Sequence, residues 1–260
     1  MWNRRGFLSG LAAATVSTRA WAGPRPIVRR DFLVCLDPGH GGDNDGCRSA
    51  DGSVVEKDLT LRTALALQAA VLAKLPHVQV VLTREDDQSC TLAERVAFAN
   101  AAEADAFISL HTNASQSKTQ HGFETYVLDA RASSLEAART ARRENDAELC
   151  EPGSTRDGAE VATMLRQLEM TQQRLAAGRF AQSIQAHQRK RFPKRVDRGV
   201  RQAPFDVLMG ARMPAVLFES GFLDHEEEGS LLTSDTGMDS IVGGLADAVV
   251  DLYRAHVQTR

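Results

Sequence analysis

The chain has 260 residues, 43% of them hydrophobic and 25% charged, with a formal net charge of −3. These values are typical of a soluble globular protein with an ample core. A mildly acidic balance argues against binding nucleic acid through the net charge. Beyond the N-terminal segment, no run of about 18 apolar residues predicts a membrane span.

The N-terminal segment 1–22 has the ordered regions of a twin-arginine signal peptide. Arg4 and Arg5 come first, a weakly apolar stretch follows at 10–16, and small residues precede a cleavage site after Ala22. A basic tail without a targeting role would not explain this order. We therefore expect export to the periplasm by the twin-arginine route. Cleavage removes three arginines and no acidic residue, so the mature net charge is −6.

Short apolar runs alternate with segments of helical periodicity along the rest of the chain. After a short lead at 23–30, strands are predicted at 32–36, 78–82, 106–110, 122–128 and 215–219. Helices are predicted from Glu56 to Pro76, at 92–100, from Ser133, at 161–188 and at 241–256. This alternation predicts one α/β domain over 31–256, with a mostly parallel twisted sheet and helices on both faces.

Several local details are also predicted. Alternating residues at 122–128 are typical of an edge strand, and the basic segment 189–201 is predicted to be a connector. Leu65 and Leu175 are expected on the buried faces of their helices. Ser133 is expected to cap the charged helix, because a glutamate stands three residues later.

The cysteines have no spacing typical of a structural zinc site. Cys35 lies inside the first predicted strand and is expected to be a small core residue. The periplasm permits disulfides, but twin-arginine substrates usually fold before export, so we expect none to be needed for folding. The sequence leaves open whether Cys47 pairs with Cys90, and it leaves the state of Cys150 open too.

Three predicted strands end in a group that can bind a metal or move a proton. His40 follows the first strand, His111 follows the third, and Glu219 closes the strand at 215–219. Glu56 begins the helix after the first loop and can return to the same edge. Functional groups of such sheets collect beyond the carboxyl ends of the strands, so we expect these four to face one cleft.

These residue types suit zinc. Two imidazoles and a carboxylate leave a fourth position for water, and a further glutamate can accept the proton of that water. Plainer interpretations are structural histidines and an arginine partner for Glu219. The glycines around His40 are expected to let the backbone bend and to keep bulk away from a large substrate. Asp37 is expected to orient His40.

Four blocks of sequence stand in order along the chain. They are LDPGHGG at 36–42, EKDLTL at 56–61, SLHTNA at 109–114 and LFESGFL at 217–223. They resemble the signature blocks of the zinc-dependent N-acetylmuramoyl-L-alanine amidases of the Amidase_3 type. VLTR at 81–84 and GVRQA at 199–203 resemble secondary blocks of the same family.

The resemblance implies a role for each site residue. His40, Glu56 and His111 would be the ligands of one Zn²⁺ per chain, and Glu219 would be the general base. The reaction would be hydrolysis of the peptidoglycan amide between the lactyl group of N-acetylmuramic acid and L-alanine, in cell separation or wall turnover. A supporting role in packing or hydrogen bonding is implied for Arg84 and Asn113.

The segment 132–158 resembles the sequence that leads into a regulatory insert of some division-associated relatives. There, a helix covers the zinc and an activator protein must displace it. On this interpretation Glu144, Glu148 or Glu151 would occupy the open zinc position. A charged surface helix without a regulatory role is the alternative. Such relatives often carry an N-terminal targeting domain, which we do not expect here because the first block follows Ala22 closely.

Two other functions compete with the wall amidase. A non-catalytic peptidoglycan-binding protein would be expected to lack a ligand or the base, and all four residues are present. A zinc peptidase that acts within the stem peptide would use the same chemistry, so only the family resemblance favours the amidase.

Overall fold

The computed structural model describes residues 32–146 and 162–258. The predicted signal peptide, lead and cleavage site lie outside these residues. The described strands are β1 (Leu33–Pro38), β2 (Gln79–Leu82), β3 (Ala106–Asn113), β4 (Phe123–Leu128), β5 (Asp197–Ala203) and β6 (Ala215–Phe222). The described helices are α1 (Glu56–Lys74), α2 (Leu92–Ala101), α3 (Leu135–Asp146), α4 (Ala162–Arg191), the short η1 (Asp206–Leu208), α5 (Glu226–Thr233) and α6 (Asp235–Gln258).

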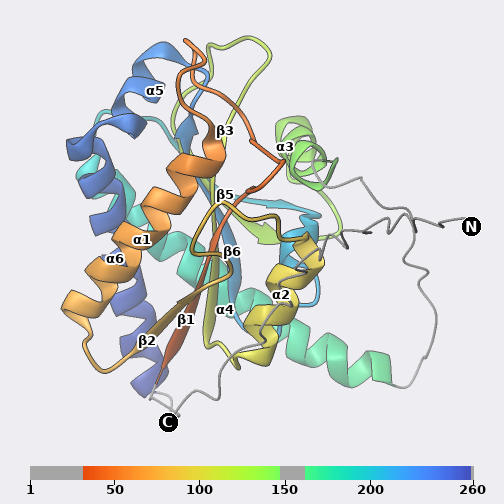
Figure 1. Ribbon diagram of the computed structural model, residues 1–260. Helices are drawn as coiled ribbons and strands as arrows, with labels where there is room; N and C mark the ends of the chain where they lie inside the picture. Colours follow the sequence, from red (N-terminus) through yellow and green to blue (C-terminus); the bar gives the residue numbers. More distant parts are fainter. Residues whose placement is uncertain (1–31, 147–161, 259–260) are drawn as a thin grey trace, which may run out of the picture.

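The strands form one sheet in the order β2-β1-β3-β6-β4-β5 (Figure 1). β2, β1, β3 and β6 are parallel to one another, β4 is antiparallel to β6, and β5 is parallel to β4. Every residue of β1, β3 and β6 is buried, as expected for parallel strands that are covered on both faces. The predicted α/β fold with a mostly parallel sheet is confirmed.

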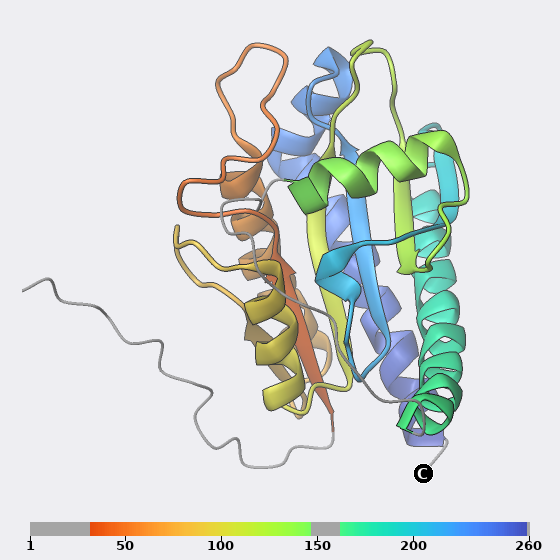
Figure 2. The same cartoon turned by 90° about the vertical axis from the view of Figure 1, so that its right-hand side faces the viewer.

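Helices cover the two faces of the sheet in separate groups. On one face, Val34 of β1 shares a core with Phe180 of α4 and Leu245 of α6. On the other face, Cys35 shares a core with Ala99 of α2 and with α3. Figure 2 shows α3 in front of the sheet and α6 behind it. Within the described residues, no helix combines the length and apolarity that a membrane crossing requires.

The predictions for β4 and for 189–201 were wrong. β4 lies between β6 and β5 and is almost wholly buried, so it is not an edge strand. The basic segment supplies the end of α4 and then β5. The reason is a buried ion pair: Glu124 of β4 accepts a hydrogen bond from Arg198 of β5, and Arg201 of β5 lies 2.8 Å from the same carboxylate oxygen. The two arginines of β5, the edge strand, thus face a buried carboxylate of the neighbouring strand.

The predictions that Leu65 and Leu175 lie on the buried faces of their helices were also wrong. Leu65 is 42% exposed and Leu175 is 60% exposed. The buried stripe of α1 runs through Leu67 and Val71 at a spacing of four, and Leu65 lies outside it. In the described part of α4, the buried apolar stripe runs through Ala177, Phe180 and Ile184, and Leu175 lies outside it.

The structure also tests the predicted N-cap of α3 and the predictions for the cysteines. The hydroxyl of Ser134, not that of Ser133, accepts a hydrogen bond from the backbone of Ala137 at 3.1 Å. Cys35 is a buried core residue, as predicted. Within the described residues, no disulfide joins Cys47 to Cys90.

Candidate metal centre

His111 and Glu219 are neighbours on adjacent strands of the sheet. β3 continues to Asn113 and β6 to Phe222, so both residues lie inside strands that are longer than predicted. They pair in register between β3 and β6, and the register shifts just after His111. The longer strands carry both side chains to the carboxyl edge of the parallel sheet, where α/β proteins place functional groups.

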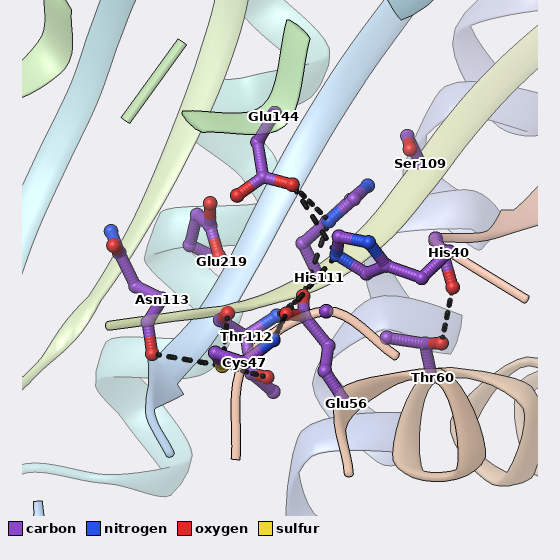
Figure 3. Close-up of polar contacts among 12 residues, drawn as sticks. His40, Cys47, Glu56, Thr60, Ser109, His111, Thr112, Asn113, Glu144 and Glu219 are labelled. Carbon is purple, nitrogen blue, oxygen red and sulfur yellow. Dashed lines mark hydrogen bonds and ion pairs between the residues drawn. The ribbon is translucent and has the colours of Figure 1, made fainter. Parts of the chain in front are cut away.

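Four side chains from different elements point toward one another at this edge (Figure 3). His40 follows β1, Glu56 begins α1, His111 lies in β3 and Glu144 lies in α3. One ligand atom from each lies within 4.8 Å of the others, and all four residues are buried. Nε2 of His40 is 3.1 Å from Oε2 of Glu56, and Nδ1 of His111 is 3.2 Å from Oε1 of Glu56. The structure therefore brings together the three predicted ligands.

Two buried atoms of this cluster lack a hydrogen bond. Nε2 of His40 and Oε2 of Glu144 lie 3.3 Å apart, yet neither has a hydrogen-bond partner among the described residues. A buried polar atom is costly without a partner, and a cation would supply one to both. Imidazole nitrogens with carboxylate oxygens are a donor set that zinc prefers. The residues present fit a zinc ion.

The charges around the cluster favour a cation. Burial works against a charge on His111, but the carboxylates of Glu144 and Glu56 raise its pKa to about 9. Burial also works against the Glu56 carboxylate, and His40 and His111 nevertheless hold its pKa well below the ordinary value. A divalent cation at this position would replace the protons that the imidazoles otherwise bind.

A hydrogen bond determines which nitrogen of His40 faces the cluster. Nδ1 of His40 lies 3.0 Å from Oδ1 of Asn44. Because an amide oxygen only accepts, Nδ1 carries the proton and Nε2 is left as the ligand atom. Asn44 lies in a polar loop, and nothing in its sequence context indicates this contact.

Backbone N–H groups from the first loop and from β3 hold Glu56. Its Oε2 accepts from the backbone N–H of Cys47 at 2.9 Å, and its Oε1 accepts from that of Thr112 at 2.8 Å. Glu56 is the first residue of α1, where the helix dipole favours negative charge. These contacts hold the Glu56 side chain at the edge of the sheet where His111 lies.

Glu219 is buried beside the cluster, and neither of its carboxylate oxygens has a hydrogen-bond partner among the described residues. Burial and the charge of Glu144 raise the pKa of this carboxyl well above its ordinary value, although Arg143, 3.8 Å away, acts in the opposite direction. A carboxyl with a raised pKa next to a candidate metal site is suited to accept and return a proton.

The glycines around His40 are required by close packing of the turn, and the clearance for a large substrate stays a prediction. A Cβ atom on Gly39 would lie 2.4 Å from Nε2 of His111. A Cβ atom on Gly41 would lie 2.5 Å from the backbone oxygen of Gln88. Gly41 also has a φ of 124°, which glycine adopts without strain. Close packing of the turn against its neighbours therefore explains these glycines.

Asp37 does not touch the side chain of His40, contrary to the prediction. Its buried carboxylate accepts hydrogen bonds from Thr83 at 2.6 Å, Ser109 at 2.7 Å and Arg95 at 2.8 Å. Arg95 was missed at the level of sequence, although it lies beside Val96 on the inward side of α2. Its position next to Val96, on the apolar face of α2, could have indicated a buried arginine with an acidic partner.

Arg84 and Asn113 make contacts of a supporting kind. Arg84 donates to the backbone oxygens of Pro38 and Gly39, both at 2.9 Å. The amide nitrogen of Asn113 donates to Oε1 of Glu124 at 2.7 Å.

Of the three glutamates considered for the fourth position, Glu144 lies at the cluster. Glu148 and Glu151 lie outside the described residues. Arg143, which the sequence reasoning missed, donates to Oε1 of Glu144 at 2.7 Å and to the backbone oxygen of Ala114 at 2.9 Å. α3 thus brings one carboxylate and one guanidinium to the site.

Known proteins with similar sequences include N-acetylmuramoyl-L-alanine amidases. The N-acetylmuramoyl-L-alanine amidase CwlM of Bacillus licheniformis is 33% identical over 220 residues, which cover 85% of this chain and 68% of CwlM. The probable amidase AmiB of Haemophilus influenzae is 30% identical over 237 residues, which cover 90% of this chain and 55% of AmiB. The chain thus spans between about half and two thirds of these relatives.

Solved structures are similar as well. The catalytic domain of the amidase CwlV from Bacillus (Paenibacillus) polymyxa has a TM-score of 0.62 and 26% identity, with 85% of this chain and 97% of that chain covered. An amidase from Clostridium difficile 630 has a TM-score of 0.64 and 27% identity, with 86% and 97% covered. The family match itself extends over residues 34–251 and includes His40, Glu56, His111 and Glu219. The chain therefore belongs to the N-acetylmuramoyl-L-alanine amidase family of the Amidase_3 type.

Proposed function

We propose that this chain is a zinc-dependent hydrolase of peptidoglycan, and that it cleaves the amide between the lactyl group of N-acetylmuramic acid and L-alanine. Membership of the family supports the substrate. One observation carries the metal assignment: His40, Glu56 and His111 converge around a buried imidazole nitrogen that has no hydrogen-bond partner among the described residues.

The ligand atoms would be Nε2 of His40, Nδ1 of His111 and a carboxylate oxygen of Glu56, with one zinc per chain. When bound, zinc polarises the scissile carbonyl and increases the acidity of a water molecule. Asn44 keeps the proton of His40 on Nδ1, and the backbone N–H groups of Cys47 and Thr112 keep Glu56 in place.

Glu219 is the general base in this proposal. It takes a proton from the attacking water and passes it to the nitrogen of L-alanine, so that the amine departs in neutral form. The C–N bond breaks and a C–O bond forms, which leaves a lactyl carboxylic acid that ionises by releasing the second proton of the water, and a peptide with a free N-terminal L-alanine. Burial of Glu219 raises its affinity for the proton that it must hold between these two steps.

The two competing functions make different predictions on purified peptidoglycan. A stem-peptide peptidase would release fragments that do not begin with L-alanine, and a binding protein would release none. To test the metal, the purified chain is stripped with a chelator and reloaded with zinc. We expect hydrolysis to stop and then return, and we expect Glu219→Gln to remain bound to zinc with hydrolysis lowered on the order of 100- to 10,000-fold.

We further propose that α3 inhibits the site. Oε2 of Glu144 lies 3.3 Å from Nε2 of His40 and 3.2 Å from Nδ1 of His111, where a fourth ligand would displace water. Arg143 pairs with Glu144 and approaches Glu219 at 3.8 Å. One turn of α3 would therefore block the open metal position with Glu144 and place the positive charge of Arg143 near Glu219.

Contacts at both ends hold α3 in this position. Glu136 near its start lies 3.0 Å from Arg198 of β5. Asn145 near its end donates to the backbone oxygen of Pro204 at 2.8 Å and accepts from the backbone of Asp206 at 3.0 Å. Activity would require these contacts to break, which is the step that an activator protein would promote. In this proposal 132–158 is a regulatory insert in a catalytic domain that spans 31–256.

The proposed setting is the periplasm, in cell separation or wall turnover. Segment 1–22 would direct export by the twin-arginine route, and 23–30 would remain as a short lead. N-terminal sequencing of the chain from a periplasmic fraction should begin at Gly23. A variant with both Arg4→Lys and Arg5→Lys should accumulate uncleaved in the cytoplasm, whereas export of this variant at the normal rate would contradict the route.

A further inference from the structure

Two buried arginines hold the turn that carries His40. Arg84 donates to the backbone oxygens of Pro38 and Gly39. Arg95 donates through Nη1 to the backbone oxygen of Pro38 at 2.8 Å, and through Nη2 to that of His40 at 2.7 Å. Three successive carbonyl groups are therefore fixed by side chains from outside the turn, and among the described residues only Arg95 reaches the carbonyl of His40.

His40 needs such support because of its backbone conformation. Its φ is 62°, in the left-handed region that residues other than glycine seldom occupy. A conformation of this kind persists where the surrounding structure imposes it, and it is often found at functional sites. The backbone conformation of His40 sets the direction of its Cα–Cβ bond, and this bond sets the direction in which the imidazole leaves the backbone.

Asp37 supplies the counter-ion that lets Arg95 lie in this place. Both side chains are almost wholly buried, and Oδ1 of Asp37 lies 2.8 Å from Nη1 of Arg95. Burying an unpaired guanidinium would be costly. The hydroxyl groups of Thr83 and Ser109 also donate to Asp37. Asp37 in β1 is therefore linked to the residue after β2 and to β3.

We propose that Arg95 is a positioning residue for the metal centre. One arm of its guanidinium is held by Asp37, and the other holds the carbonyl of His40, so the fork fixes the direction in which Nε2 of His40 points. This inference rests on the proposed zinc site. Asp37 then has an orienting role through Arg95, without direct contact with the imidazole of His40.

The geometry makes Arg95→Lys the informative variant. A lysine keeps a positive charge for Asp37, but one ammonium group cannot reproduce the two-armed contact to Asp37 and His40. We expect the affinity for Zn²⁺, measured by competition with a chromogenic chelator, to fall about tenfold or more. The absorption bands of the Co²⁺-loaded protein should shift, because they report the geometry of the ligands.

Two control variants separate positioning from general stability. Arg84→Lys disturbs the same turn without touching the carbonyl of His40, and its Zn²⁺ affinity should stay within a few-fold of wild type. Leu245→Ala truncates the core far from the turn and should lower the melting temperature without changing the Co²⁺ spectrum. If Arg95→Lys is too unstable to purify, Ser109→Ala loosens Asp37 more gently and should shift the spectrum in the same direction.

The outcomes are distinct. If the wild-type chain binds no Zn²⁺, the proposed function fails and takes this inference with it. If wild type binds Zn²⁺ but Arg95→Lys matches it in affinity and Co²⁺ spectrum, the zinc site stands and the positioning role is overturned. Equal losses in Arg95→Lys and Arg84→Lys would also overturn it, because they would indicate a general effect on the turn.

Discussion

Oε2 of Glu144 in α3 lies 3.2 Å from Nδ1 of His111 in β3, and both atoms belong to the cluster that could hold a metal ion. Glu144 is buried, and its pKa is held well below the ordinary value against the effect of burial by Arg143 and His111. An ionised carboxylate in this place competes with water for a metal.

Removing this carboxylate should activate the enzyme. Glu144→Gln keeps the shape of the side chain but removes its charge, so hydrolysis of peptidoglycan should rise about tenfold or more, since even 1.4 kcal/mol of inhibitory contact corresponds to that factor. Asp146→Asn is the matched control, because Asp146 is an exposed carboxylate of the same helix that pairs with Arg142. Equal activity of wild type and Glu144→Gln would count against inhibition by α3.

Zinc content should depend on His111 and not on other histidines. His111→Ala removes one of three proposed ligands and should reduce bound zinc, measured by elemental analysis after dialysis, from one per chain to well below one. His121→Ala is the control, since His121 is exposed and lies outside the cluster. Retention of one zinc by His111→Ala would remove His111 from the ligand set.

The metal-free protein should lose stability as pH rises through the pKa of Glu219. Burial and Glu144 raise this pKa above its value of 4.5 in the unfolded chain, so the folded state holds the proton more tightly. Stability from this group is complete below pH 4.5 and declines above it by up to about 1.4 kcal/mol per pH unit until the folded pKa is passed.

Glu219→Gln cannot ionise and should escape this loss. In urea unfolding of metal-free protein, the variant should be more stable than wild type at about pH 7.5 and similar to it at about pH 4. A constant difference between the two proteins across this pH range would contradict the raised pKa.

Glu124 should be a major contributor to stability. Its buried carboxylate lies between Asn113, Arg198 and Arg201, so Glu124→Gln leaves guanidinium groups poorly paired. We expect a loss of about 3 kcal/mol in the free energy of unfolding. Glu136→Gln removes a half-exposed carboxylate from the same two arginines and should cost about 1 kcal/mol or less. Similar losses in both variants would contradict the importance of burial.

The sequence was sufficient for the fold class and for the convergence of His40, Glu56 and His111. Buried apolar runs mark the strands, and parallel strands bring their carboxyl ends to one edge, so residues at those ends meet whatever the details of packing.

The remaining features depend on contacts between distant polar residues. β5 was missed because its arginines pair with Glu124 inside the sheet, and pairing of this kind leaves no apolar run. Arg95 was missed because its partner Asp37 lies on another element. Leu65 was misplaced because several leucines of α1 share a helical spacing, and only the packing against α6 and the sheet selects the buried stripe.

In the proposed reaction, the chain cuts the bond between N-acetylmuramic acid and L-alanine. The most direct test is mass spectrometry of the products that zinc-loaded Glu144→Gln releases from purified peptidoglycan, with Glu219→Gln as the inactive control. We predict stem peptides with a free N-terminal L-alanine and glycan strands with free lactyl carboxylates. Fragments cut within the stem peptide, or no release by the zinc-loaded chain, would show that this bond is not the one cleaved.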